Sequence, residues 1–175
     1  MRPSPQLLHE PRPVDFPRMR HAPILGTRSL AWPDEAACAS FAQALAARPA
    51  LRDAYLELHG ELGAGKTSFV RHLLRALGVQ GRIKSPTYAV VEPYLAGDLA
   101  ISHFDFYRFD DPREWEDAGF RELFAAPGLK LAEWPQKAQA VLPLPDLRLL
   151  ITVGDDDARQ VQVQACTPRG LELLP

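Results

Sequence analysis

The chain has 175 residues, of which 46% are hydrophobic and 24% charged, the balance of one globular domain with its own core. A formal net charge of −2 gives no general attraction to nucleic acid or anionic lipid, so any contact with RNA would need a partner or a local patch. No apolar run approaches the roughly 20 residues that span a bilayer, and a signal peptide is not evident. We expect a cytoplasmic protein with reduced Cys38 and Cys166, although a disulfide between them stays open.

The first 23 residues contain six of the 17 prolines and four arginines, but few large apolar groups. Such a stretch buries too little surface to offset the entropy lost on ordering. We therefore expect residues 1–23 to form a disordered arm and residues 24–175 to form a single domain. A basic tether for RNA or a protein partner is the alternative role of the arm, and Met19 is an alternative start of the chain.

The first half of the domain predicts alternating strands and helices. Residues 24–30 predict a short strand, and the helix that follows ends before Pro49. The apolar segment 54–59 predicts a buried strand that leads directly into a glycine-rich loop. After the loop, apolar residues in 66–77 recur at helical spacing.

The second half predicts short helices between strands. The helices are expected at residues 111–119, 120–126 and 135–142. The strands are expected at residues 88–94, 99–106, 129–133, 147–153 and 161–165, of which the first two and the last two form hairpins.

The glycine-rich loop is Gly60-Glu61-Leu62-Gly63-Ala64-Gly65-Lys66-Thr67, which matches the sequence motif of a phosphate-binding loop, or P-loop. Its glycines permit the tight backbone that turns successive N–H groups toward an anion, and the helix N-terminus adds further free amides. Lys66 would reach the β- and γ-phosphates of ATP, and the Thr67 hydroxyl would take one position on Mg²⁺. An ordinary glycine-rich turn is the alternative. The nucleotide-binding residues expected here are Gly60, Leu62, Gly63, Ala64, Gly65, Lys66, Thr67 and Ser68.

A P-loop between a buried strand and a helix is typical of one fold class. We expect an α/β, P-loop NTPase-like domain with three layers. Its central sheet should mix parallel and antiparallel strands and end in a C-terminal hairpin.

Two acidic residues end apolar strands and are candidates for metal binding or catalysis. Asp105 could hold Mg²⁺ or cap the next turn, and Glu133 could hold the ion, orient an attacking water or be a solvated strand end. Thr87 lies where switch-type hydrolases carry a hydroxyl that senses the γ-phosphate, and the alternative is that Ser85-Pro86-Thr87 is only a turn. His59, His72 and His103 stand singly and are expected to be structural.

Four motifs occur in a set order and spacing between Leu62 and Pro135, within a match that covers roughly Leu25 to Val163. They are Leu62-Gly63-Ala64-Gly65-Lys66-Thr67-Ser68-Phe69, Lys84-Ser85-Pro86-Thr87-Tyr88 with Val91-Glu92-Pro93-Tyr94, His103-Phe104-Asp105-Phe106-Tyr107-Arg108, and Glu133-Trp134-Pro135. In order and spacing they resemble the TsaE family, the ATPases needed to make threonylcarbamoyladenosine in bacterial tRNA. The first motif is generic, and the other three make the resemblance specific.

The resemblance implies roles for individual positions. Lys66 and the loop amides would bind phosphate, and Thr67 and Glu133 would bind Mg²⁺. Asp105 would be the strand-end acidic group at the metal. The implied catalytic residues are therefore Glu133, Asp105 and Lys66.

The resemblance also implies residues around the rest of the nucleotide. Thr87 would be switch-like, and Trp134 would flank the site. Glu35 and Arg159 lie where family members close the nucleotide site, near the first helix and the last hairpin. The departures from the family pattern are mild, since Glu61 replaces the usual aspartate and Ser68 a common threonine, and neither removes a phosphate donor.

The family also implies partners. ATP binding and slow hydrolysis would act on a complex of the TsaB and TsaD proteins and reset it between turnovers. TsaD transfers the threonylcarbamoyl group to the adenosine beside the anticodon, from an adenylate made by TsaC. The contact with tRNA would then be indirect.

Three other classes of protein compete with this interpretation. A small-molecule kinase usually has an arginine-rich lid over the phosphates, and no segment after the core has clustered arginines. A GTP switch would carry an Asn-Lys-x-Asp segment after a late strand, which the sequence lacks. A pure binding module with a vestigial loop is the third class. The chain retains the residues that such a module would not need, which are Lys66, Thr67, Asp105 and Glu133.

Overall fold

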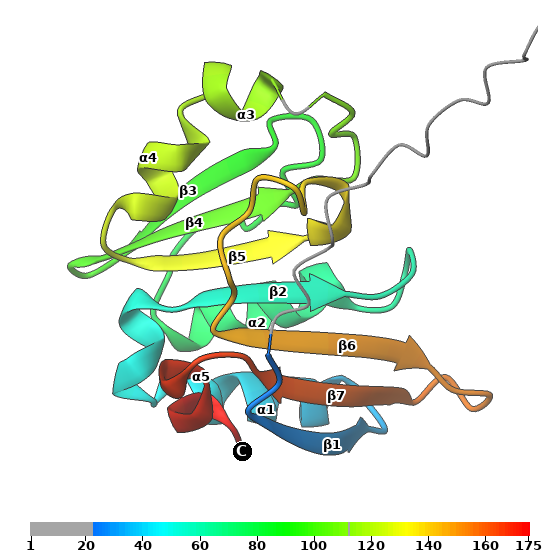
Figure 1. Cartoon of the computed structure of the whole chain (residues 1–175). Coiled ribbons are helices and arrows are strands. Elements are labelled where there is room, and N and C mark those ends of the chain that lie inside the picture. Colours follow the sequence, from blue (N-terminus) through cyan, green and yellow to red (C-terminus); the bar gives the residue numbers. More distant parts are fainter. Residues whose placement is uncertain (1–22, 112) are drawn as a thin grey trace, which may run out of the picture.

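A mixed β-sheet organises the chain in the computed structural model, which describes residues 23–111 and 113–175 (Figure 1). Within those residues the sheet has seven strands, in the order β1-β7-β6-β2-β5-β4-β3. They are β1 (Gly26–Trp32), β2 (Tyr55–His59), β3 (Val91–Ala96), β4 (Leu99–Asp105), β5 (Leu129–Glu133), β6 (Leu147–Val153) and β7 (Arg159–Ala165).

The centre of the sheet is parallel and both edges are antiparallel. Strand β2 pairs in parallel with β5 and β6, and β5 pairs in parallel with β4. At one edge β7 pairs antiparallel with β6 and β1, and at the other β3 pairs antiparallel with β4. The predicted α/β fold with a mixed sheet and a C-terminal hairpin is therefore confirmed.

Helices on both faces of the sheet make three layers. The long helices α1 (Glu35–Ala46) and α2 (Lys66–Ala76) lie behind the sheet in Figure 1, and α4 (Phe120–Ala125) packs on the opposite face. The remaining helical segments are α3 (Arg113–Asp117), α5 (Pro168–Leu173) and the 3-10 turns Pro49–Asp53 and Pro135–Lys137. In the described part of the chain, none of the helices is both long and apolar enough to cross a membrane.

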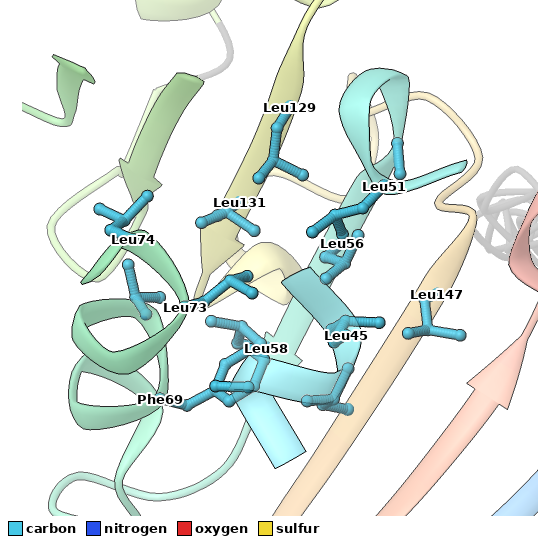
Figure 2. Close-up of a cluster of buried hydrophobic side chains, with 14 of the residues drawn as sticks. Leu45, Leu51, Leu56, Leu58, Phe69, Leu73, Leu74, Leu129, Leu131 and Leu147 are labelled. Atoms are coloured by element: carbon cyan, nitrogen blue, oxygen red, sulfur yellow. The ribbon is translucent and has the colours of Figure 1, made fainter. Parts of the chain in front are cut away.

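The larger core lies between the sheet and the two long helices. Leucines from β2, β5 and β6 point toward Leu45 of α1 and Leu73 of α2, as Figure 2 shows. A second, aromatic core on the opposite face joins Phe104 of β4 to Phe120 and Phe124 of α4, with ring centroids 5.6 and 4.7 Å apart. Alternate residues of each central strand therefore serve different cores, which is how a parallel sheet buries both faces.

The central strand β2 contains one charged residue, Glu57, which is 5% exposed. Burial alone would raise the pKa of Glu57, but hydrogen bonds with His59 (3.0 Å) and Arg148 (2.8 Å) hold that pKa below its usual value. A buried carboxylate is tolerated when its oxygens are satisfied in this way.

Several predicted boundaries were wrong. Strand β1 runs from Gly26 to Trp32 because its register with β7 ends at Arg159. Residues 88–90 form turns and not strand, since the Val90 N–H donates to the Pro86 carbonyl at 2.8 Å. The helix expected at residues 135–142 is one 3-10 turn.

Helix α5 was missed although its start has a readable signal. The Thr167 hydroxyl accepts a hydrogen bond from the Gly170 N–H at 3.1 Å, and Pro168 occupies the first turn. The expected single domain at residues 24–175 stays a prediction, and the predicted arm lies, except for Pro23, outside the described residues.

Gly128 precedes β5 at a close approach between strands. It has φ of +120°, and a Cβ atom at this position would lie 2.3 Å from the Ala100 carbonyl oxygen of β4. Gly81 also has positive φ, at +81°, but a Cβ there would meet nothing within 4 Å.

We predict that Gly128→Ala destabilises the protein more than Gly81→Ala does. Positive φ should cost each variant about 1 kcal/mol, and the clash should add about 1–3 kcal/mol to Gly128→Ala alone. Urea unfolding of both variants measures the difference. Equal midpoints would show that β5 can move away from β4 freely.

Candidate functional site

The phosphate-binding loop connects β2 to α2 with the backbone that its sequence predicts. Gly60, Gly63 and Gly65 have φ of +154°, +81° and +108°, values that side chains disfavour. A Cβ at Gly60 would lie 2.6 Å from the Ile151 carbonyl oxygen, so this glycine also permits the contact with β6. At Gly63 the space for a Cβ is open, which leaves the loop accessible to an anion.

The Lys66 ammonium lies inside this loop. Its Nζ donates to the carbonyl oxygens of Gly60 (2.5 Å) and Glu61 (2.9 Å), and it stands 4.2 Å from the centre of the Trp134 ring. Burial lowers the pKa of Lys66, against the opposing effect of Glu133, Asp105 and Glu61. A nearby anion would favour the charged ammonium, so this position suits a phosphate ligand.

Thr67 and Glu133 face each other at the start of α2 and the end of β5. The Thr67 hydroxyl lies 3.0 Å from both carboxylate oxygens of Glu133, which is 2% exposed. His103 contacts the same carboxylate, with its Nε2 2.8 Å from Oε1. Glu133 is therefore a buried group with partners and not the solvated strand end that the sequence left open.

Asp105 lies beside Glu133 because the two residues pair in the parallel register of β4 and β5. Its Oδ2 accepts hydrogen bonds from the hydroxyls of Ser85 (2.8 Å) and Thr87 (3.3 Å), and its Oδ1 accepts one from the Tyr107 N–H (2.9 Å). Asp105 thus caps the following turn and also holds the expected switch residue.

The segment around Thr87 is strained. Val90 has φ of +66°, an uncommon conformation for a β-branched residue. Its carbonyl oxygen accepts a hydrogen bond from the Asp105 N–H at 2.8 Å. The segment is therefore tied to Asp105 through both side chains and backbone.

A pocket next to the loop is lined by predicted residues from the beginning and the end of the domain sequence. Glu35 and Cys38 of α1, Ser68 of α2 and Arg159 of β7 line it, together with Trp32, Asp34, Ala64, Gly65 and Asp157. The Arg159 guanidinium donates to the carbonyl oxygens of Ala64 (3.2 Å) and Gly63 (3.4 Å). Glu35 also contacts His72, at 3.1 Å.

The structure therefore places the predicted residues in two adjoining groups. Lys66, Thr67, Asp105, Glu133 and Trp134 surround the mouth of the loop, whereas Glu35, Ser68 and Arg159 line the pocket beside it. Leu62, in the loop itself, is 77% exposed.

The oxygen atoms at this site fit Mg²⁺. A hydroxyl and a buried carboxylate, with a second carboxylate beside them, are hard oxygen ligands of the kind that this ion prefers. Residues 23–111 and 113–175 contain no group of three or more His, Cys, Asp or Glu that could hold a metal.

His103, which the sequence analysis expected to be structural, contacts the candidate metal ligand Glu133. It lies two residues before Asp105, so both point to the same face of β4. That spacing was visible in the sequence, but the contact with Glu133 also required the pairing of β4 with β5.

Comparisons with known proteins bear on the family of the chain. The family described as threonylcarbamoyl adenosine biosynthesis protein TsaE matches residues 32–161. The tRNA threonylcarbamoyladenosine biosynthesis protein TsaE of Haemophilus influenzae is 43% identical over 117 residues, which cover 67% of this chain and 73% of the relative. The protein of the same name from Bacillus subtilis is 37% identical over 110 residues, covering 63% and 68%.

A solved structure supports the same relationship. The crystal structure of Bacillus subtilis YdiB superposes with a TM-score of 0.68 at 28% sequence identity, and the match covers 85% of this chain and 91% of that one. The fold, the four motifs and these similarities agree, and the chain belongs to the TsaE family of threonylcarbamoyl adenosine biosynthesis proteins.

Proposed function

We propose that this protein binds ATP with Mg²⁺ and hydrolyses it slowly, as a step in making threonylcarbamoyladenosine in tRNA. The observation that carries the proposal is the Thr67 hydroxyl 3.0 Å from both oxygens of Glu133, directly after the phosphate-binding loop. Two hard oxygen ligands on separate elements meet there, at the place where a triphosphate would present its oxygens.

The residues around the loop have two roles, phosphate binding and metal binding. Loop amides and Lys66 bind and orient the phosphates, and Thr67 and Glu133 hold the metal, with Asp105 beside them. Bound Mg²⁺ would neutralise charge on the phosphate oxygens. Asp105 holds Thr87 through the 3.3 Å hydrogen bond, which lets the segment after α2 respond to a γ-phosphate.

The second group would hold the rest of the nucleotide. Glu35 and Arg159 line the pocket beside Gly65, and Arg159 already contacts the loop carbonyls. Trp134 lies against Lys66 and would flank the same site. An arginine that bridges loop and pocket can sense whether both are filled.

The names of the relatives place them in tRNA threonylcarbamoyladenosine biosynthesis. We propose that this chain acts there on a complex of TsaB and TsaD in the cytoplasm, and that it contacts tRNA only through them. Its net charge of −2 suits docking on proteins better than direct binding to RNA.

Lys66→Ala should remove detectable ATP binding, measured by calorimetric titration with Mg²⁺. A hydrogen bond to a charged group contributes about 1.5–3 kcal/mol, and Lys66 would contact two phosphates. Lys137→Ala, which removes an exposed lysine from the turn after Trp134, is the matched control and should bind as the wild type does. Unchanged affinity in Lys66→Ala would contradict the assignment of the loop.

Glu133→Ala should still bind ATP but hydrolyse it at least about 100-fold more slowly, because the metal loses its carboxylate ligand or the attacking water loses its orientation. Phosphate release at several Mg²⁺ concentrations measures this. Glu122→Ala, an exposed glutamate on α4, serves as control. Full hydrolysis by Glu133→Ala would remove Glu133 from the mechanism.

Association with TsaB and TsaD should depend on the nucleotide. Pull-down of the two partners with this chain, with and without ATP, measures the dependence, and Lys66→Ala should abolish it. Equal recovery of the partners in both conditions would contradict coupling between ATP and the complex.

A further inference from the structure

A fully buried histidine lies beneath the proposed metal site. His103 of β4 is 0% exposed, and its register partner on β5 is Leu131, two residues before Glu133. Its ring therefore points into the same layer as Glu133 and the first turn of α2. Among the described residues, its Nε2 has Glu133 Oε1 as a partner at 2.8 Å, and its Nδ1 has none.

The direction of the Nε2 contact follows from the chemistry of its partner. An ionised carboxylate offers only acceptors, so the hydrogen must lie on Nε2 of His103. The Nδ1 atom is then a buried polar atom that has no partner among the described residues, which costs free energy. The fold therefore keeps the contact between Nε2 and Glu133 although burial of the unpaired Nδ1 is unfavourable.

The two oxygens of Glu133 differ in their surroundings. Among the described residues, Oε1 contacts both His103 and Thr67, whereas Oε2 contacts Thr67, at 3.0 Å. The His103 donor on Oε1 fixes the rotation of the carboxylate about its Cγ–Cδ bond. Both oxygens are thereby held at the Thr67 hydroxyl, and Oε2, which has no contact with His103, keeps coordination capacity for an ion.

We propose that His103 is a positioning residue, whose Nε2–H holds the Glu133 carboxylate in the orientation that binds the divalent cation together with Thr67. This inference rests on the proposed function. It is the same arrangement in which outer groups orient the ligands of a metal, and removing such a group typically lowers metal affinity about 10–100-fold.

A purely structural role predicts a different response to substitution. A histidine that only fills space could be exchanged for any side chain of similar polarity that packs. A positioning histidine needs a donor at the place of Nε2. The amide nitrogen of glutamine can reach that place, whereas the shorter asparagine places its amide near Nδ1 and leaves Glu133 without its donor.

The matched pair His103→Gln and His103→Asn in the full chain tests the proposal. We would measure binding of Mn²⁺, a spectroscopic substitute for Mg²⁺, by electron paramagnetic resonance in the presence of ADP. We expect His103→Asn to bind Mn²⁺ about 10–100-fold more weakly than the wild type. His103→Gln should stay within a few-fold of the wild type, and both variants should bind ADP normally without metal.

Three results would overturn the proposal. The first is wild-type Mn²⁺ affinity in His103→Asn, and the second is an equal loss in both variants. The third is loss of folding in both variants, seen in thermal unfolding, which would assign His103 to the core alone. A wild-type protein that binds neither ADP nor Mn²⁺ would overturn the proposed function itself, which separates that failure from the failure of this inference.

Discussion

The parallel register of β4 and β5 is the constraint on which the rest of the site depends. It sets Asp105 beside Glu133, so that two carboxylates stand at the carboxyl ends of neighbouring central strands. Strand β2 runs parallel to β5, so the phosphate-binding loop that follows β2 lies at the same end of the strands. Because the carboxyl ends of these parallel strands lie together, a triphosphate, its metal and the residues that respond to them can share one place.

Glu133 and Asp105, the two carboxylates at these strand ends, have different environments. Glu133 is held from the sheet by His103 and from α2 by Thr67, so it faces the loop. Asp105 accepts hydrogen bonds from Ser85 and Thr87, so it faces the strained segment that follows α2. One group therefore belongs to the proposed metal site and the other to the proposed switch, although they are neighbours in the sheet.

Much of the architecture could be predicted from local signals. The apolar runs at 54–59 and 129–133 and the strict alternation at 147–153 predicted three strands within a residue of their observed bounds. The weaker elements failed where a contact distant in sequence decides the outcome. Residues 88–90 have the side chains of a strand, yet hydrogen bonds to Pro86 and Asp105 hold them as a turn.

By itself the sequence determined the P-loop, since its glycines and lysine have a fixed spacing that only one kind of backbone path satisfies. It also identified the strand-end acids and, through four motifs, the family. Only the tertiary structure decided that Glu133 is buried, that His103 contacts it, and that Arg159 bridges the loop and the adjoining pocket. Those facts depend on strand order and register, which set residues distant in sequence side by side and which no local pattern encodes.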